Sequence, residues 1–133
     1  MSMLYRDIFN AAVEMLSEDH ATGDVEDYER RAGYLLGTVT AQLKPIDKRY
    51  RAAHSQGEAV KSTALCVDLD TAFPLCDAFV SAATYYLASM LVMEENERMG
   101  DRIFALYADE IASIEASLPA TARSITDRYS ILI

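Results

Sequence analysis

Two apolar helical patterns follow each other closely in residues 74–118, and they constrain the fold more than any other feature. The first repeats apolar residues at three- and four-residue spacing, which indicates a buried helical face: Leu75, Phe79, Ala82, Ala83, Tyr86, Leu87, Met90 and Leu91. The second carries one apolar stripe, made of Met99, Ile103, Tyr107, Ile111, Ile114 and Leu118. Because few polar residues separate them, we expect two antiparallel neighbouring helices against which the rest of the chain packs.

Residue types at the ends of the two patterns support this helix pair. Pro74 suits the first position of a helix, where a missing backbone N–H leaves nothing unpaired. Asn96 is suited to cap the second helix, and Glu97 is favoured beside its positively polarised N-terminus. Small residues on the first helix would let the second approach closely: Ser81, Ala82, Ala83, Ala88 and Ser89.

The N-terminal part of the sequence predicts two further helices. Residues 2–17 are amphipathic, with Ser2 as the N-cap and an apolar face of Tyr5, Ile8, Phe9, Ala12, Val13 and Leu16. Asp24 caps a longer helix, whose apolar positions are Val25, Tyr28, Ala32, Leu35, Leu36, Val39 and Leu43. Pro45 disfavours helical geometry at Lys44, so this second helix is expected to stop or kink there.

The fold class follows from these patterns. The chain has 133 residues, of which 51% are hydrophobic, so it is long and apolar enough for one domain with a true core. Five Gly and three Pro are few, which favours helices over a sheet. We predict an all-α, single-domain, four-helix bundle-like fold over residues 1–118, with a long loop between the second and third helices and a C-terminal tail at 119–133. The conformation of residues 55–71 stays open.

A search for catalytic, cofactor or metal sites finds none. The sequence has two His and two Cys, with no Glu-x-x-His and no Cys-x-x-Cys. Cys66 and Cys76 are read as reduced core residues, and Gly33 with Gly37 as a place of close helix packing. We therefore predict no enzyme activity and no bound cofactor.

Charge and hydropathy exclude two other classes of partner. A formal net charge of −9 makes the chain a poor ligand for free nucleic acid, and solubility alone accounts for such a charge. The longest uncharged run, residues 78–93, has sixteen residues and is too short for a bilayer span of about 20, so it is read as a core helix. Arg6 and Asp7 interrupt the start before an apolar signal region forms, so we expect no secretion signal and no membrane partner.

Four short segments in the C-terminal two-thirds carry a resemblance to a known family. They are Phe73-Pro74-Leu75, Ala-Thr-Tyr-Tyr-Leu-Ala at 83–88, Glu94-Glu95-Asn96 and Phe-Ala-Leu-Tyr-Ala-Asp-Glu at 104–110. In this order they resemble the small head–tail connector (adaptor) proteins of tailed bacteriophages and prophages. The first two helices match that family in type and order only.

The resemblance implies a structural role without catalysis. Such proteins are subunits of a homo-oligomeric ring, commonly a dodecamer, at the head–tail junction of the virion, and they are assembled in the bacterial cytoplasm. The ring docks on the portal protein, extends the DNA channel and offers a platform to the tail or stopper protein, with DNA only as passing cargo. Subunits of this kind are often monomers when isolated.

The resemblance also assigns two candidate interfaces. The tail ends in Ser-Ile-Leu-Ile, and the residues alone leave open whether it folds back or docks on another chain. The resemblance implies that this tail is a portal-docking arm, with candidate residues Arg123, Arg128, Tyr129, Ile131, Leu132 and Ile133. The basic segment 44–51 becomes an inter-subunit or portal contact through Lys44, Lys48, Arg49 and Arg51, with residues 24–29 of a neighbour as trial partner. The alternative for this segment is a solvated helix end, where cations suit the helix dipole.

Two other functions stay open at the level of sequence. One is a small acidic cytosolic helical module that binds a partner helix in a groove and has no catalysis. The other is an enzyme with a site in the bundle core, for which this sequence offers few histidines or cysteines.

Overall fold

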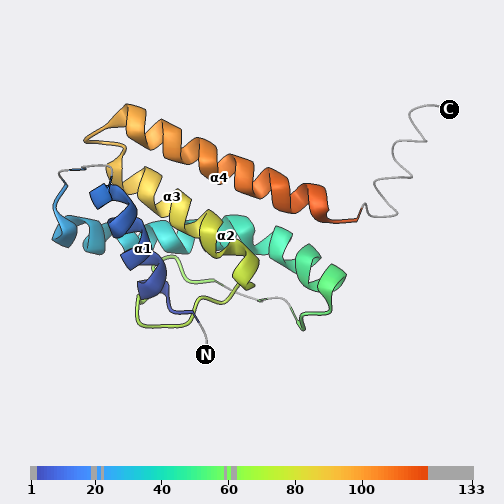
Figure 1. The fold of residues 1–133 in the computed structure, drawn as a ribbon. Helices are drawn as coiled ribbons and strands as arrows, with labels where there is room; N and C mark the ends of the chain where they lie inside the picture. Colours follow the sequence, from blue (N-terminus) through green and yellow to red (C-terminus); the bar gives the residue numbers. More distant parts are fainter. Residues whose placement is uncertain (1–2, 19–20, 22, 59, 61–62, 120–133) are drawn as a thin grey trace.

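The computed structural model describes residues 3–18, 21, 23–58, 60 and 63–119. This part of the chain is all-helical, which confirms the predicted class (Figure 1). It contains four α-helices and one short 3₁₀ helix: α1 (Tyr5–Glu18), α2 (Val25–His54), η1 (Asp77–Phe79), α3 (Val80–Val92) and α4 (Glu97–Ser117). Within the described ranges the only β-type pairing is an isolated bridge between Leu4 and Ala72.

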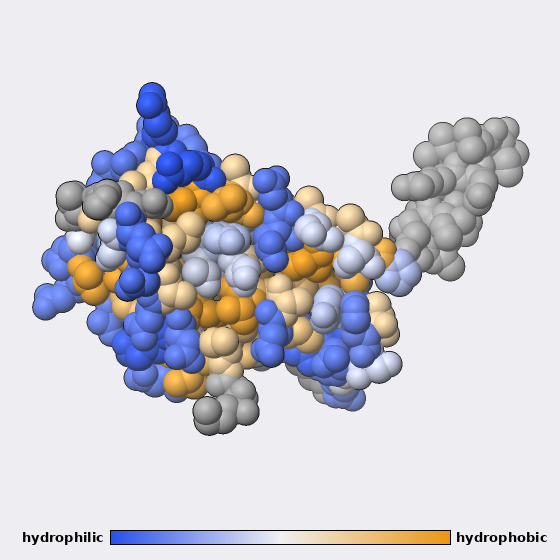
Figure 2. All heavy atoms as spheres, in the orientation of Figure 1, coloured by the Kyte–Doolittle hydropathy of each residue, from blue (hydrophilic) through white to orange (hydrophobic). Residues whose placement is uncertain are grey.

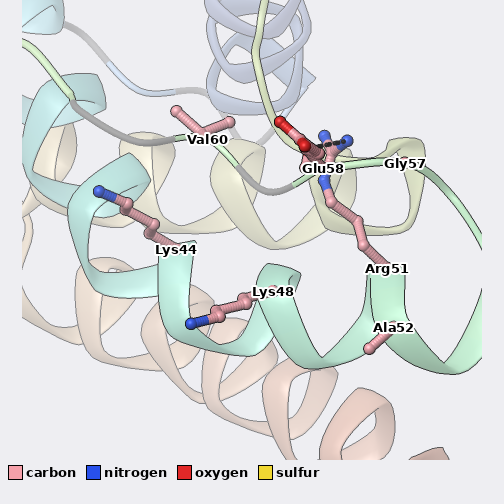
Figure 3. Close-up of a pocket in the computed structure, with 7 residues that line it drawn as sticks. All are labelled: Lys44, Lys48, Arg51, Ala52, Gly57, Glu58 and Val60. Carbon is pink, nitrogen blue, oxygen red and sulfur yellow. Dashed lines mark hydrogen bonds between the residues drawn. The ribbon is translucent and has the colours of Figure 1, made fainter.

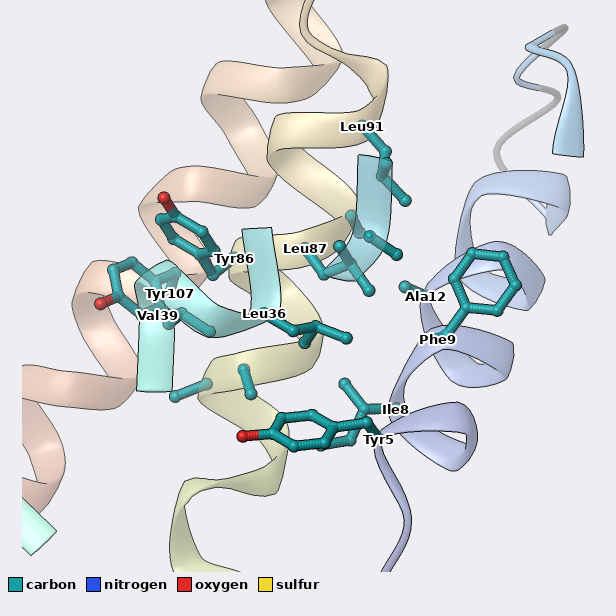
Figure 4. Packing of buried hydrophobic residues seen from close by; sticks show 14 of the residues in the cluster. Tyr5, Ile8, Phe9, Ala12, Leu36, Val39, Tyr86, Leu87, Leu91 and Tyr107 are labelled. Atoms are coloured by element: carbon teal, nitrogen blue, oxygen red, sulfur yellow. The ribbon is translucent and has the colours of Figure 1, made fainter. Parts of the chain in front are cut away.

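Helix α3 lies at the centre and packs against each of the other three α-helices. It is apolar on nearly all sides, as expected of a helix enclosed by its neighbours. Figure 4 shows Leu87 and Leu91 of α3 directed toward α1, and Tyr86 of α3 beside Tyr107 of α4. The rings of Tyr86 and Tyr107 meet edge to face, with centroids 5.3 Å apart. The predicted organising role of this region is therefore seen in the packing.

The α3–α4 pair agrees closely with its prediction. The two helices run side by side, joined by a short connection, and Asn96 caps α4 by accepting a hydrogen bond from Met99 N at 3.0 Å. The predicted stripe of α4 faces the core, with four residues buried and Met99 and Ile111 half-buried: Ile103, Tyr107, Ile114 and Leu118. The apolar face predicted for α1 is likewise buried, except for half-buried Val13. Its predicted cap, Ser2, lies outside the described residues.

The start of α3 was predicted too early. Residues 74–76 are not helical; η1 begins at Asp77 and α3 at Val80. Two contacts to α2 hold this segment extended, since Pro74 O accepts from Arg51 Nη2 at 2.8 Å and Cys76 N donates to Asp47 Oδ1 at 2.9 Å. These tertiary hydrogen bonds outweigh the local preference of Pro74 for a helix start.

The sequence predicts that the second helix stops or kinks at Lys44, and the stop is wrong. Asp24 caps α2 as predicted, accepting from Glu26 N at 3.0 Å, but the helix then continues through Pro45 to His54. Proline removes one helical hydrogen bond and crowds the preceding turn. Pro45 is exposed, while Asp47, two residues further on, is fully buried and accepts from Cys76 N of the segment before η1. Tertiary contacts thus hold the last turns of α2 in place.

Candidate interaction surface

Helix α2 carries opposite charges at its two ends. Four carboxylates lie at its start, opposed locally by Arg30 and Arg31: Asp24, Glu26, Asp27 and Glu29. Four cations lie near its end: Lys44, Lys48, Arg49 and Arg51. At 1.5 Å per residue, Asp27 and Lys48 are about 32 Å apart along the helix. Both clusters suit the helix dipole, and they also give one long helix two separate charged surfaces.

The acidic start of α2 is tied to the rest of the protein. Asp27 accepts from Arg31 Nε at 3.0 Å and pairs with Arg30. Arg6 of α1 bridges Glu29 at 3.1 Å and Asp70 of the loop at 2.7 Å. The Arg6 hydrogen bond is the main reason that the pKa of Asp70 lies below its usual range. These exposed pairs set the orientation of the carboxylates more than they stabilise the fold.

The structure separates the four predicted basic residues into two roles. Lys48 and Arg49 are exposed and Lys44 is half-buried, but the Arg51 side chain is only 16% exposed. Arg51 binds Asp47 and donates to the carbonyl oxygens of Gln56, Glu58 and Pro74. It therefore joins both ends of the loop to α2, and its guanidinium is largely occupied inside its own chain.

Two hollows lie between α2 and the loop that follows it. One hollow, of about 580 Å³, is lined by Lys44, Lys48, Arg51, Ala52, Gly57, Glu58 and Val60. Figure 3 shows Lys44 and Lys48 extending from the same side of α2, with Val60 across from them on the loop. A second hollow, of about 520 Å³, is lined by Gly37, Thr38, Ala41, Gln42, Thr63, Ala64 and Leu65. We call the two together the α2–loop groove.

Two glycines let the loop lie close to α2. A Cβ on Gly37 would lie 2.3 Å from Leu65 O, and one on Gly33 would lie 2.8 Å from Val67 O. Val67 N donates to Gly33 O at 3.0 Å, although that carbonyl belongs to a helix. The predicted close packing at these glycines is therefore present, but its partner is the loop and not another helix.

The same loop places Cys66 and the apolar side chain of Leu65 at the surface. Cys66 is exposed, which corrects its prediction as a core residue, and Cys76 is half-buried; both are free thiols. Leu65 is 79% exposed and Val25, between two acids at the start of α2, is 49% exposed. Figure 2 shows hydrophilic side chains gathered at the end of the molecule where α2 and α4 begin, with apolar side chains exposed in the middle of this face.

The buried polar groups of the described residues are satisfied within the chain. Tyr5 Oη and Thr40 Oγ1 are 2.9 Å apart, and Thr40 also donates to Leu36 O at 2.7 Å. No group of three or more His, Cys, Asp or Glu in the described ranges is placed to hold a metal ion. None of the described helices combines the length and apolar character that crossing a bilayer requires.

The second predicted interface cannot be placed. Its six residues lie outside the described residues: Arg123, Arg128, Tyr129, Ile131, Leu132 and Ile133. Sequence reasoning also missed three contributors to the groove, Ala41, Val60 and Leu65, because only the path of the loop brings them beside the basic residues of α2.

Comparison with known proteins finds no relative of this chain. No protein-family model matches the chain, and no curated protein or solved structure matches it either. The function is therefore inferred from the residues of this chain alone.

Proposed function

We propose that this chain is a structural, non-catalytic subunit of the head–tail connector of a tailed bacteriophage or prophage. The observation that carries the proposal is the separation of opposite charges on α2, with carboxylates at residues 24–29 and cations at residues 44–49. The helix pair α3–α4 adds support, because it contains most of the segments that resemble that family.

A ring needs a contact in which two different surfaces of identical subunits meet. At a net charge of −9, identical subunits repel one another, so the contact must bring a basic surface against an acidic one. The two ends of α2 supply both surfaces in every copy. The ring, commonly twelve-fold in such connectors, would then assemble on a portal that acts as its template.

The negative net charge also suits a channel through which DNA passes. Carboxylates that line a lumen repel the phosphate backbone, so DNA moves through as cargo without being retained. The proposed location is the head–tail junction of the virion, after assembly in the bacterial cytoplasm. In this proposal the segment 119–133 is the arm that docks on the portal, and the far side of the ring receives the tail or stopper protein.

Light scattering of the purified protein, alone and mixed with candidate portal proteins, tests this proposal. The expected result is a monomer alone that joins one portal in a fixed stoichiometry. The matched variant is a chain truncated after Pro119, which should keep its fold and lose portal binding. Indifference of the full chain to every portal tried would reject the connector function.

A second candidate function is a small acidic interaction module. The exposed Leu65 beside the hollow at Gly37 and Ala41 favours it, because a partner helix could lay an apolar residue there. Such a module would bind its partner as a monomer and would ignore portal proteins, so the same scattering experiment separates the two functions.

A further inference from the structure

We infer that the α2–loop groove of one copy receives the acidic start of α2 from a second copy. The exposed Val25, between Asp24 and Glu26, is the apolar anchor of this contact. The inference rests on the proposed function and deepens it, since it names the contact that joins neighbouring subunits of the ring.

The charges of the two surfaces are complementary. The end of α2 that borders the groove holds Lys44, Lys48, Arg49 and Arg51 against the two carboxylates of Asp47 and Glu58. The start of α2 has the reverse balance, with four carboxylates against Arg30, Arg31 and Arg6, of which Arg6 pairs with Glu29. Because Arg51 is occupied by Asp47 and by loop carbonyls, the attraction rests on the exposed Lys48 and Arg49. Complementary charge of this kind selects the partner and aligns it.

The apolar parts of the two surfaces also match. Val25, between Asp24 and Glu26, is 49% exposed, and Leu65 is 79% exposed. Ala41 lies beside Leu65 in the lining of the second hollow, so the groove offers an apolar floor next to the lysines. Docking of Val25 there would remove both exposed side chains from water, which favours association.

One copy cannot fill its own groove. Residues 25 and 48 are both on α2, and 23 residues of helix separate them by about 35 Å. The contact must therefore form between copies, and a joined pair still offers the groove of one copy and the acidic end of the other. Such a head-to-tail contact gives a closed ring when its rotation closes and an open chain when it does not.

Disulfide trapping on the isolated protein tests this contact. In a chain that carries Cys66→Ser and Cys76→Ser, Val25→Cys and Ala41→Cys are introduced singly and together. A disulfide requires Cα atoms within about 7 Å, and positions 25 and 41 lie about 24 Å apart along α2, so no bond between them can form inside one chain. The expected result is a dimer from a mixture of the two single variants, and a ladder of higher species from the chain with both.

Two controls make the outcome decisive. Ala112→Cys, on an exposed site of α4, is paired with Val25→Cys and should give about tenfold less dimer, since it lies outside both surfaces. Lys48→Glu, in a chain with Val25→Cys and Ala41→Cys, should reduce the ladder about tenfold, while Arg98→Glu, the same charge change on α4, should not.

Three results would overturn the inference. They are dimer yields equal to those of the Ala112→Cys control, efficient trapping by Val25→Cys alone, and a ladder unaffected by Lys48→Glu. Portal binding is measured separately, so trapping without portal binding would reject only the connector function. Portal binding without trapping would reject only this contact.

Discussion

Asp47 and Arg51, one turn apart on α2, form an ion pair with Nε and Oδ2 2.8 Å apart, and the Asp47 side chain is fully buried. The other oxygen of Asp47 accepts from Cys76 N, and Arg51 reaches Pro74 O. The pair thus fixes the segment that leads into η1 and α3 against the last turns of α2. It is a structural junction at which the loop both leaves and rejoins the helical core.

Asp47→Ala is expected to destabilise the fold by about 3 kcal/mol, because it leaves the Arg51 charge and the Cys76 N–H without their buried partner. Urea denaturation measures this as a loss in the free energy of unfolding. Asp47→Asn keeps an acceptor for Cys76 N and should cost less. Asp109→Ala, at an exposed site of α4, is the control and should change stability by no more than about 0.5 kcal/mol. Equal effects of Asp47→Ala and Asp109→Ala would contradict this role.

Gly37→Ala combines a gain in helix propensity with a steric clash against the loop. Alanine gains about 1 kcal/mol over glycine in a helix, but its Cβ would lie 2.3 Å from Leu65 O, a backbone atom that moves only with the whole loop. We expect a net loss of about 1–3 kcal/mol in unfolding free energy.

Amide hydrogen exchange locates that effect. The Val67 N–H, bonded to Gly33 O, should exchange faster in Gly37→Ala because residues 64–67 are lifted from α2. Thr38→Ala, at the adjacent exposed position, should leave both stability and exchange near those of the parent. An unchanged Val67 amide would show that the loop tolerates the methyl group.

The two thiols should differ in reactivity. Burial, followed by the hydrogen bond and charge of Asp47, raises the pKa of Cys76 to about 11, whereas Cys66 is exposed. The thiolate is the reactive form, so Cys66 should be alkylated first at pH 8, and the Cys76 rate should rise about tenfold per pH unit. The variants Cys66→Ser and Cys76→Ser assign the two rates. In Asp47→Asn, the Cys76 profile should shift to lower pH.

Stability should fall under alkaline conditions. Burial raises the pKa of Tyr5, Tyr86 and Tyr107 above the ordinary value near 10, and burial with the Glu95 hydrogen bond does the same for Tyr28. Above pH 10 the unfolded chain loses these protons before the folded one does. The stabilisation is therefore complete below that pH and is lost as the pH rises further.

Urea midpoints between pH 8 and pH 11, with phenolate absorbance as a second signal, measure this loss. Tyr86→Phe should make the decline shallower, because one buried hydroxyl is removed. Tyr34→Phe, at a side chain that is 57% exposed, is the control and should leave the slope unchanged. A midpoint that does not fall above pH 10 would contradict the buried state of these phenols.

Local patterns predicted the four α-helices and two of their caps. The stripe of α4 and the caps at Asn96 and Asp24 were recognisable because they depend on residues within one or two turns. The stop allowed at Pro45 on the same local grounds is wrong, because contacts of buried Asp47 hold the helix beyond the proline. A single-sequence pattern contains no information on that burial.

Only part of the candidate surface could be predicted from the sequence. Lys44, Lys48 and Arg49 are recognisable as part of a dense basic cluster, but no local pattern indicates that Arg51 turns inward to Asp47. The groove also depends on a loop whose path is set by two glycines on a distant part of α2. Contacts between segments some 30 residues apart in the chain have no periodic signature, so they had to be seen in three dimensions.

The central place of α3 has a consequence for synthesis on the ribosome. Helix α1 packs mainly on α3 and little on α2, its neighbour in sequence. Its apolar face therefore has no proper partner until roughly sixty more residues have been added, which takes several seconds at about 5–20 residues per second. During that interval the apolar face of α1 lacks its main partner and is open to chaperones, and the core closes only when the α3–α4 hairpin emerges.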